Sequence, residues 1–143
     1  MALSYEALEI LKEQLIQMEG YRQFPYRDIQ QKLTIGIGRN LNDVGISLDE
    51  SITLLCNDIE EATSLLEKLP FFNDLEDIRK IVLINMCFNM GYAKLMQFKG
   101  MIAALEKKDY EGASKEMLSS LWAKQVPGRV KTLARMMVYN SAF

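Results

Sequence analysis

The sequence predicts a mainly helical α+β fold, in which a small β-hairpin lobe and a larger helical lobe are joined by a long helix. Two observations predict it. Apolar residues recur at helical spacing over most of the chain, and residues 21–46 instead carry Thr, Ile and aromatic residues around a polar turn. With 143 residues, 49% of them hydrophobic, the chain can bury a core without disulfides or metals. We therefore expect a single domain, residues 1–143.

Two helices have clear beginnings. The N-terminal helix is expected over residues 4–19, where Ser4 can cap the first turn and Gly20 can end the helix in a left-handed conformation. A second, linking helix is expected over residues 47–68. It begins at Ser47-Leu48-Asp49-Glu50, which has the spacing of a capping box, and it ends before a proline.

The β lobe is expected between these helices, at residues 21–46. Its hairpin strands flank a polar turn near residues 27–31, and the returning strand contains Gly36 and Gly38. Two glycines at this spacing indicate that another element or a ligand approaches the backbone closely.

The helical lobe is expected over residues 69–143, together with the N-terminal helix. Residues 77–90 are apolar on nearly every face, which predicts a buried central helix ending at Gly91. Three further helices are expected near residues 94–107, 110–122 and 127–139.

Composition excludes several classes of function. A formal net charge of −2 argues against nucleic-acid binding, which requires a dense basic surface. The chain has no histidine, which removes Ser-His-Asp and Cys-His mechanisms and most zinc sites, so we expect no metal and no cofactor. Cys56 and Cys87 follow no metal-ligand spacing, and their apolar neighbours predict buried free thiols, although a disulfide is also possible. The N-terminus is charged and helix-periodic, unlike a signal peptide, and no apolar run is long enough for membrane insertion.

Three polar side chains form a pattern that suits sugar chemistry. Glu19 lies at the end of the first helix, Asp28 lies at the hairpin turn, and Thr34 lies on the returning strand. Glycosidases require one carboxyl group to protonate the leaving oxygen and a second to activate water or attack. The negative end of the helix dipole disfavours ionisation of Glu19, which suits a proton donor. By spacing alone, a solvated glutamate at a helix end explains Glu19 as well.

Three ordered blocks of the sequence resemble the phage-type lysozymes, glycoside hydrolase family 24. The first block resembles the active-site signature of that family, the second its central helix, and the third its C-terminal segment. The blocks are Glu19-Gly20, Tyr26-Arg27-Asp28 and Thr34-Ile35-Gly36-Ile37-Gly38; Arg79-Lys80 with Leu83 to Gly91; and Trp122, Gln125, Pro127 and Arg129. The resemblance implies a lysozyme-like fold with a cleft between its two lobes.

The resemblance also implies residue roles. Glu19 matches the general acid, Asp28 the general base, and Thr34 the hydroxyl that helps to hold the attacking water. Cleavage of the β-1,4 bond between N-acetylmuramic acid and N-acetylglucosamine would proceed with inversion, for which the two carboxyl groups stand roughly 6.5–9.5 Å apart. Arg129 matches an arginine that reaches the catalytic glutamate in the family. Phe88 matches an aromatic residue that contacts substrate, but an ordinary place in the hydrophobic core explains Phe88 equally well.

The sequence departs from the family at several positions. Arg39 stands where the family often has histidine, and the acid expected to pair with it is Asp58. Between Thr34 and Asp58 the chain is shorter than the T-even members, so the small lobe is shortened. Positions with polar sugar contacts in those members hold Met101 and Glu116 here, and we do not transfer those contacts.

The biological expectation is a phage or prophage endolysin, or a lysozyme carried by a virion. Its partner would be the glycan strands of peptidoglycan, and we expect a monomer made in the host cytoplasm without a signal peptide. A holin or a virion would bring it to the cell wall, in the periplasm or outside the cell. Two alternatives stay open: a lytic transglycosylase, which the presence of Asp28 and Thr34 disfavours, and a catalytically silent glycan-binding module.

Overall fold

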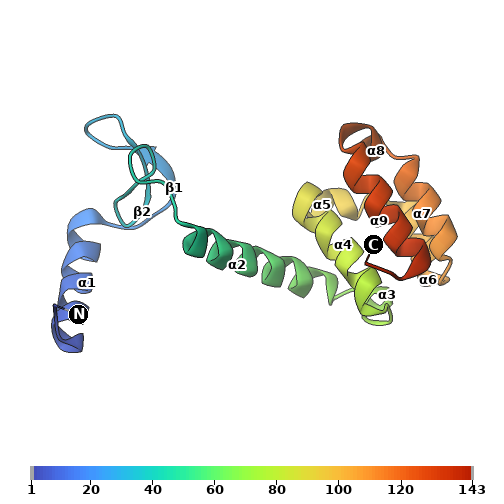
Figure 1. The fold of residues 1–143 in the computed structure, drawn as a ribbon, viewed down its shortest axis with the longest axis horizontal. Helices are drawn as coiled ribbons and strands as arrows, with labels where there is room; N and C mark the ends of the chain where they lie inside the picture. The colour runs from blue at the N-terminus through green and yellow to red at the C-terminus, as the bar shows by residue number, and fades with distance from the viewer. Residues whose placement is uncertain (1, 143) are drawn as a thin grey trace. The chain divides into compact units, whose positions relative to one another are not determined.

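The structure is a computed structural model that describes residues 2–142 (Figure 1). It is mostly helical with one small antiparallel sheet, which confirms the expected α+β class. Contacts divide the chain into two compact units, which we call the N-terminal unit (residues 1–52) and the C-terminal unit (residues 53–143). The expected assignment of the first helix to the helical lobe stays a prediction.

The N-terminal unit begins with α1 (Tyr5–Glu19), which has the expected cap at its N-terminal end and ends at Gly20, but in a different conformation from the one expected. The Ser4 hydroxyl accepts a hydrogen bond from the backbone N–H of Ala7, at 3.1 Å. At the other end Gly20 has a φ of 73°, but its ψ of 173° is extended and not that of a left-handed helix. The chain therefore leaves α1 directly into the first strand.

The sheet has one strand more than the predicted hairpin. Its order is β1 (Arg22–Arg27), β2 (Leu33–Gly36) and β3 (Arg39–Asn40), all antiparallel. In this register Thr34 lies opposite Tyr26 on one side and Asn40 on the other. The added strand places Thr34 at the centre of the sheet.

The linking helix α2 (Leu48–Leu66) begins with the expected capping box. The backbone N–H of Glu50 donates to the Ser47 hydroxyl at 3.1 Å, and the Glu50 carboxylate accepts from the N–H of Ser47 at 2.9 Å. Reciprocal bonds of this kind fix the point at which the chain leaves the β lobe.

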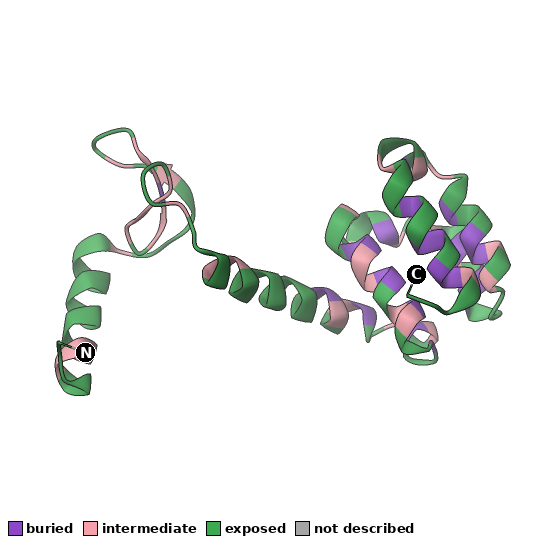
Figure 2. Ribbon diagram, viewed as in Figure 1, coloured by how far each residue is buried: buried purple, intermediate pink, exposed green. Residues whose placement is uncertain are grey.

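The C-terminal unit is a helical cluster around an apolar core, which appears as the buried residues in Figure 2. In it, α9 packs against α4, α7 and α8 (Figure 1). Residues 77–90 and 127–139 are helical as predicted. The helices expected near residues 94–107 and 110–122 are each split in two. In the second of these, the Ser120 hydroxyl accepts a hydrogen bond from the N–H of Ala123 and so caps a new helix. The helices are α3 (Pro70–Asn73), α4 (Asp77–Met90), α5 (Tyr92–Leu95), α6 (Lys99–Glu106), α7 (Tyr110–Leu118), α8 (Leu121–Gln125) and α9 (Pro127–Tyr139).

The prediction of a buried central helix, which rested on apolar residues on nearly every face, holds for only part of the surface of α4. Leu83 and Met86 are in the core, whereas Ile81 is 46% exposed and Phe88 is 47% exposed. The inward face also contains Arg79, which donates to the carbonyls of Met137 at 2.7 Å and Val138 at 2.9 Å. A buried cation therefore satisfies carbonyl groups at the C-terminal end of α9.

The two cysteines differ in environment. Both are free; Cys87 is buried, and burial raises the pKa of its thiol. Cys56, expected to be buried, is exposed, because α2 turns only its last residues, Ala62 and Leu66, into the core. Within residues 2–142, no helix combines the length and the apolar character that a bilayer crossing requires.

Candidate active site

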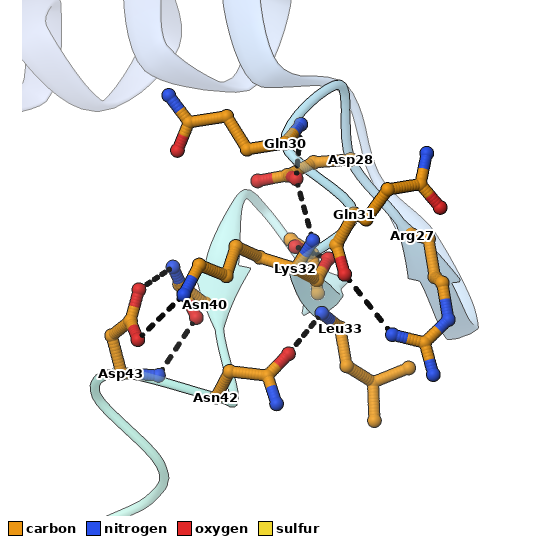
Figure 3. Close-up of polar contacts among 10 residues, drawn as sticks. Arg27, Asp28, Gln30, Gln31, Lys32, Leu33, Asn40, Asn42 and Asp43 are labelled. Atoms are coloured by element: carbon orange, nitrogen blue, oxygen red, sulfur yellow. Dashed lines mark hydrogen bonds and ion pairs between the residues drawn. The ribbon is translucent and has the colours of Figure 1, made fainter.

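The hairpin turn fixes the carboxyl group of Asp28 through backbone contacts (Figure 3). Asp28 Oδ1 accepts hydrogen bonds from the N–H groups of Gln30 and Lys32, both at 2.9 Å. Gln31 completes the turn with a φ of 63°, which is uncommon for a residue other than glycine. Among the described residues no hydrogen bond reaches Asp28 Oδ2, so this oxygen can accept a proton from a bound molecule.

Polar side chains of the second half of the lobe hold this turn in place (Figure 3). Lys32 Nζ lies 3.2 Å from Asp43 Oδ1, and Asn40 Nδ2 donates to Asp43 Oδ2 at 2.9 Å. These contacts hold the pKa of Asp43 below its usual value, chiefly through the hydrogen bond from Lys32. Arg27 Nη1 also donates to the carbonyl of Gln31, at 3.0 Å. The turn that carries Asp28 is thus organised by hydrogen bonds, with little apolar packing.

Of the three candidate catalytic residues, Glu19, Asp28 and Thr34, only Thr34 is buried, at 3% exposure. Its hydroxyl donates to the carbonyl of Lys32 at 3.0 Å. Because that bond uses its proton, Thr34 Oγ1 can bind a further group only as an acceptor. This arrangement suits a water molecule that donates one proton to Thr34.

Glu19 is the last residue of α1, and its carboxyl group lies against the backbone of Gly38. A β-carbon built at Gly38 would stand only 2.7 Å from Glu19 Oε2. The close approach that the two glycines predicted is therefore present at Gly38, while Gly36 has nothing within 4 Å of its β-carbon position. Glu19, Asp28 and Thr34 therefore all belong to the N-terminal unit, and Glu19 lies beside Gly38, which follows the strand that carries Thr34.

The structure gives Arg39 a different acidic partner from the one expected. Arg39 Nη2 lies 2.7 Å from Glu50 Oε2, and Arg39 Nη1 donates to the carbonyl of Gly45 at 3.0 Å. The hydrogen bond from Arg39, followed by those with Ser47, lowers the pKa of Glu50 to about 2, and the contact with Glu50 raises the pKa of Arg39. Glu50 reaches Arg39 because the capping box brings this glutamate to the β lobe. The expected pair of Arg39 with Asp58, a residue of the C-terminal unit, stays a prediction.

In the C-terminal unit, Phe88 lies between two hollows. One, of about 260 Å³, is also lined by Asp58, and the other, of about 370 Å³, is also lined by Asn85 and Arg129. Arg129 is exposed in the first turn of α9, and Asn85 Oδ1 is buried with no hydrogen-bond partner among the described residues. Phe88 is therefore not a buried core residue of this unit, and its contact with substrate stays a prediction.

A third hollow, of about 590 Å³, is a feature that sequence reasoning missed. Trp122 lies in its wall, packs edge-to-face on Phe98 and donates from its indole N–H to Asn89 Oδ1 at 2.7 Å. The hollow also has charged groups, Lys94 and Glu116 among them. The signal was present in the C-terminal block that contains Trp122, but the partner Asn89 is far away in sequence.

Comparison with known proteins places these residues in a family. The family profile described as phage lysozyme matches residues 16–136, which is most of the chain. Two proteins of Dictyostelium discoideum, probable T4-type lysozymes 1 and 2, are 30% and 28% identical to this chain, each over 83% of it and 88% of their own length. The pre-baseplate central spike protein Gp5 of Enterobacteria phage T4 is 28% identical over 80% of this chain, which spans 21% of that protein. The chain therefore belongs to the phage lysozyme family.

Proposed function

We propose that this protein is a muramidase that hydrolyses the β-1,4 bond between N-acetylmuramic acid and N-acetylglucosamine in peptidoglycan, with inversion. The observation that carries the proposal is the state of Asp28. Its Oδ1 is saturated by two backbone N–H groups, whereas Oδ2 has no partner among the described residues. A carboxylate held in this way suits the base that accepts a proton from water. Membership of the phage lysozyme family supports the same chemistry.

The reaction assigns one task to each of three side chains. Glu19 donates its proton to the glycosidic oxygen as the bond from the anomeric carbon to that oxygen breaks. Water attacks the anomeric carbon from the opposite face and transfers one proton to Asp28, while its other hydrogen stays on the new hydroxyl group and forms a hydrogen bond to Thr34 Oγ1. The two carboxyl groups have then exchanged protonation states, and solvent restores them.

Residues of the C-terminal unit are proposed to contact the glycan and to support the acid. Phe88 offers an exposed aromatic face that can stack on a sugar ring, and the hollow beside Trp122 offers amide and hydroxyl groups. Arg129 would support the acid as a cation. Arg39 contributes indirectly, because its ion pair with Glu50 anchors the β lobe to the start of α2.

The proposed setting is the bacterial cell wall, reached in the periplasm or from outside the cell. The protein would act as a monomer, either as an endolysin that a holin releases or as a lysozyme that a virion carries. Similarity to a spike protein of a phage supports delivery by a virion. The length of the match to T4-type lysozymes is compatible with an endolysin and with a virion lysozyme. No nucleic acid and no stable membrane insertion enter the proposal.

Digestion of purified peptidoglycan in water enriched in ¹⁸O tests the proposed reaction. Mass spectrometry of the released muropeptides should find reducing N-acetylmuramic acid ends that carry one ¹⁸O. Proton NMR of the fresh products should detect the α-anomer first, as inversion of a β-bond requires. Anhydro ends would identify a lytic transglycosylase, and binding without any release would identify a silent glycan-binding module; either result contradicts the proposal.

A further inference from the structure

Gly38 lies directly beside the carboxyl group of Glu19. A β-carbon at position 38 would stand 2.7 Å from Oε2, 3.0 Å from Cδ and 3.1 Å from Cγ of Glu19. Non-bonded heavy atoms are at their best separation at about 3.5–4.0 Å. A methyl group at position 38 and the observed position of the carboxyl group therefore exclude each other.

Two other glycines of the N-terminal unit show which part of the need for glycine comes from backbone conformation alone. Gly36, Gly38 and Gly45 have φ angles of 67°, 68° and 65°, which L-residues with side chains rarely adopt. The β-carbon positions of Gly36 and Gly45 have nothing within 4 Å. Backbone conformation alone explains a glycine at those two positions, whereas Gly38 has an additional reason that concerns Glu19.

We propose that Gly38 is a positioning residue for the acid: its lack of a side chain determines where the carboxyl group of Glu19 rests beside the sheet. The effect on turnover rests on the proposed function, but the effect on the position of the carboxyl group does not. A general acid must lie within hydrogen-bond reach of the oxygen that it protonates. A displacement of about 1 Å at a reacting group can cost about a hundredfold in rate.

The contact affects the position of the acid more than the stability of the fold. The atoms that a β-carbon would meet belong to the end of a flexible, exposed side chain, not to the backbone. In Gly38→Ala the carboxyl group therefore rotates away, and the remaining cost is that of an L-residue at positive φ. Gly36→Ala and Gly45→Ala carry that same cost and are matched controls.

The test compares the three alanine variants in the full-length chain. Their melting temperatures should fall by similar amounts. Carbon-13 NMR of the glutamate carboxyl groups, with the Glu19 signal identified by its loss in Glu19→Gln, should find that signal shifted in Gly38→Ala and unchanged in both controls. On peptidoglycan, kcat of Gly38→Ala should fall about a hundredfold with little change in apparent KM, whereas both controls should stay close to wild type.

Two results would overturn the proposal: a Glu19 signal in Gly38→Ala that matches the controls, or equal losses of turnover in all three variants. If the wild-type protein does not cleave peptidoglycan, the proposed function fails, while the NMR comparison still decides the role of Gly38. If Gly38→Ala does not fold, Gly38→Ala combined with Glu19→Ala removes all three close atoms. That double variant should then melt near Gly36→Ala, and continued failure to fold would contradict the proposal.

Discussion

The two units of this protein are stabilised in different ways. In the C-terminal unit, apolar side chains of α2 through α9 form one continuous buried cluster. In the N-terminal unit, Thr34 is the one buried side chain among the described residues, and α1 buries none. Capping bonds, an Asp28-centred turn and the ion pairs of Lys32 with Asp43 and of Arg39 with Glu50 organise that unit instead.

Because of this difference, we expect the C-terminal unit to determine stability and the N-terminal unit to position the reactive groups. An apolar core is tolerant of pH and salt and provides most of the free energy of folding. Polar turns orient individual carboxyl and hydroxyl groups, and each bond contributes only about 0.5–1.5 kcal/mol to stability. The unit that carries the proposed acid and base is therefore the one held mainly by directional contacts, and substitutions should separate stability from turnover along the same boundary.

The largest effect on stability is expected from the core of the C-terminal unit. Leu83 is 1% exposed, and Leu83→Ala should lower the free energy of unfolding by about 2–5 kcal/mol through lost burial and a cavity. Ile81→Ala on the same helix, at 46% exposure, is the matched control and should cost clearly less. Chemical denaturation with a fit of the midpoint and slope measures both. Equal losses would mean that α4 does not distinguish an inner from an outer face.

A smaller loss, confined to turnover, is expected at the centre of the sheet. Thr34→Ala removes the oxygen proposed to accept a hydrogen bond from the attacking water, and kcat should fall about tenfold to a hundredfold while apparent KM holds. Thr34→Ser keeps the hydroxyl and should recover most of the rate. Steady-state kinetics on peptidoglycan fragments decide the matter; a higher KM with an unchanged kcat would make Thr34 a contact for substrate.

The smallest effect is expected from the ion pair of Arg39 with Glu50, and it should depend on pH. The hydrogen bond from Arg39, together with smaller contributions from the hydrogen bonds with Ser47, lowers the pKa of Glu50 from 4.5 to about 2 in the folded protein. A depressed pKa adds stability above the unfolded value, and this contribution is lost as pH falls from 4.5 toward 2. Glu50→Gln should therefore melt below wild type at neutral pH, and the gap should close toward pH 2. Glu60→Gln, an exposed change on α2, is the control; a gap that is constant with pH would exclude the ion pair as its cause.

Much of the fold could be predicted because its signals are local. The bounds of α4 and α9 and the caps at Ser4 and Ser47 follow from periodicity and from residues within one turn of each helix end. The third strand could not be predicted, since two residues carry no periodicity. The exposure of Cys56 was also missed, because helical spacing does not reveal how much of an apolar face has a partner.

The candidate site also has parts that the sequence could predict and parts that it could not. Glu19, Asp28 and Thr34 lie close in sequence and share one unit, so the amino-acid sequence alone is enough to identify their motif. The contact of Arg39 with Glu50 was not foreseen, because the hydrogen-bonded cap that brings Glu50 to the β lobe was considered only as a helix start, and the expected pair of Arg39 with Asp58 stays a prediction. The contact of Gly38 with Glu19 was foreseen only as an unspecified close approach.

The most direct test of the central claim is the rate at which Glu19→Gln clears purified peptidoglycan, with Glu13→Gln as the control on the same helix. Glutamine keeps the shape of the side chain but has no carboxyl proton to donate, so clearance should fall at least about a hundredfold. Glu19→Gln should melt at or above the wild-type temperature, because a negative charge at the C-terminal end of α1 has been removed. Glu13→Gln should clear at the wild-type rate. A folded Glu19→Gln protein that clears peptidoglycan nearly as fast as wild type would contradict the account.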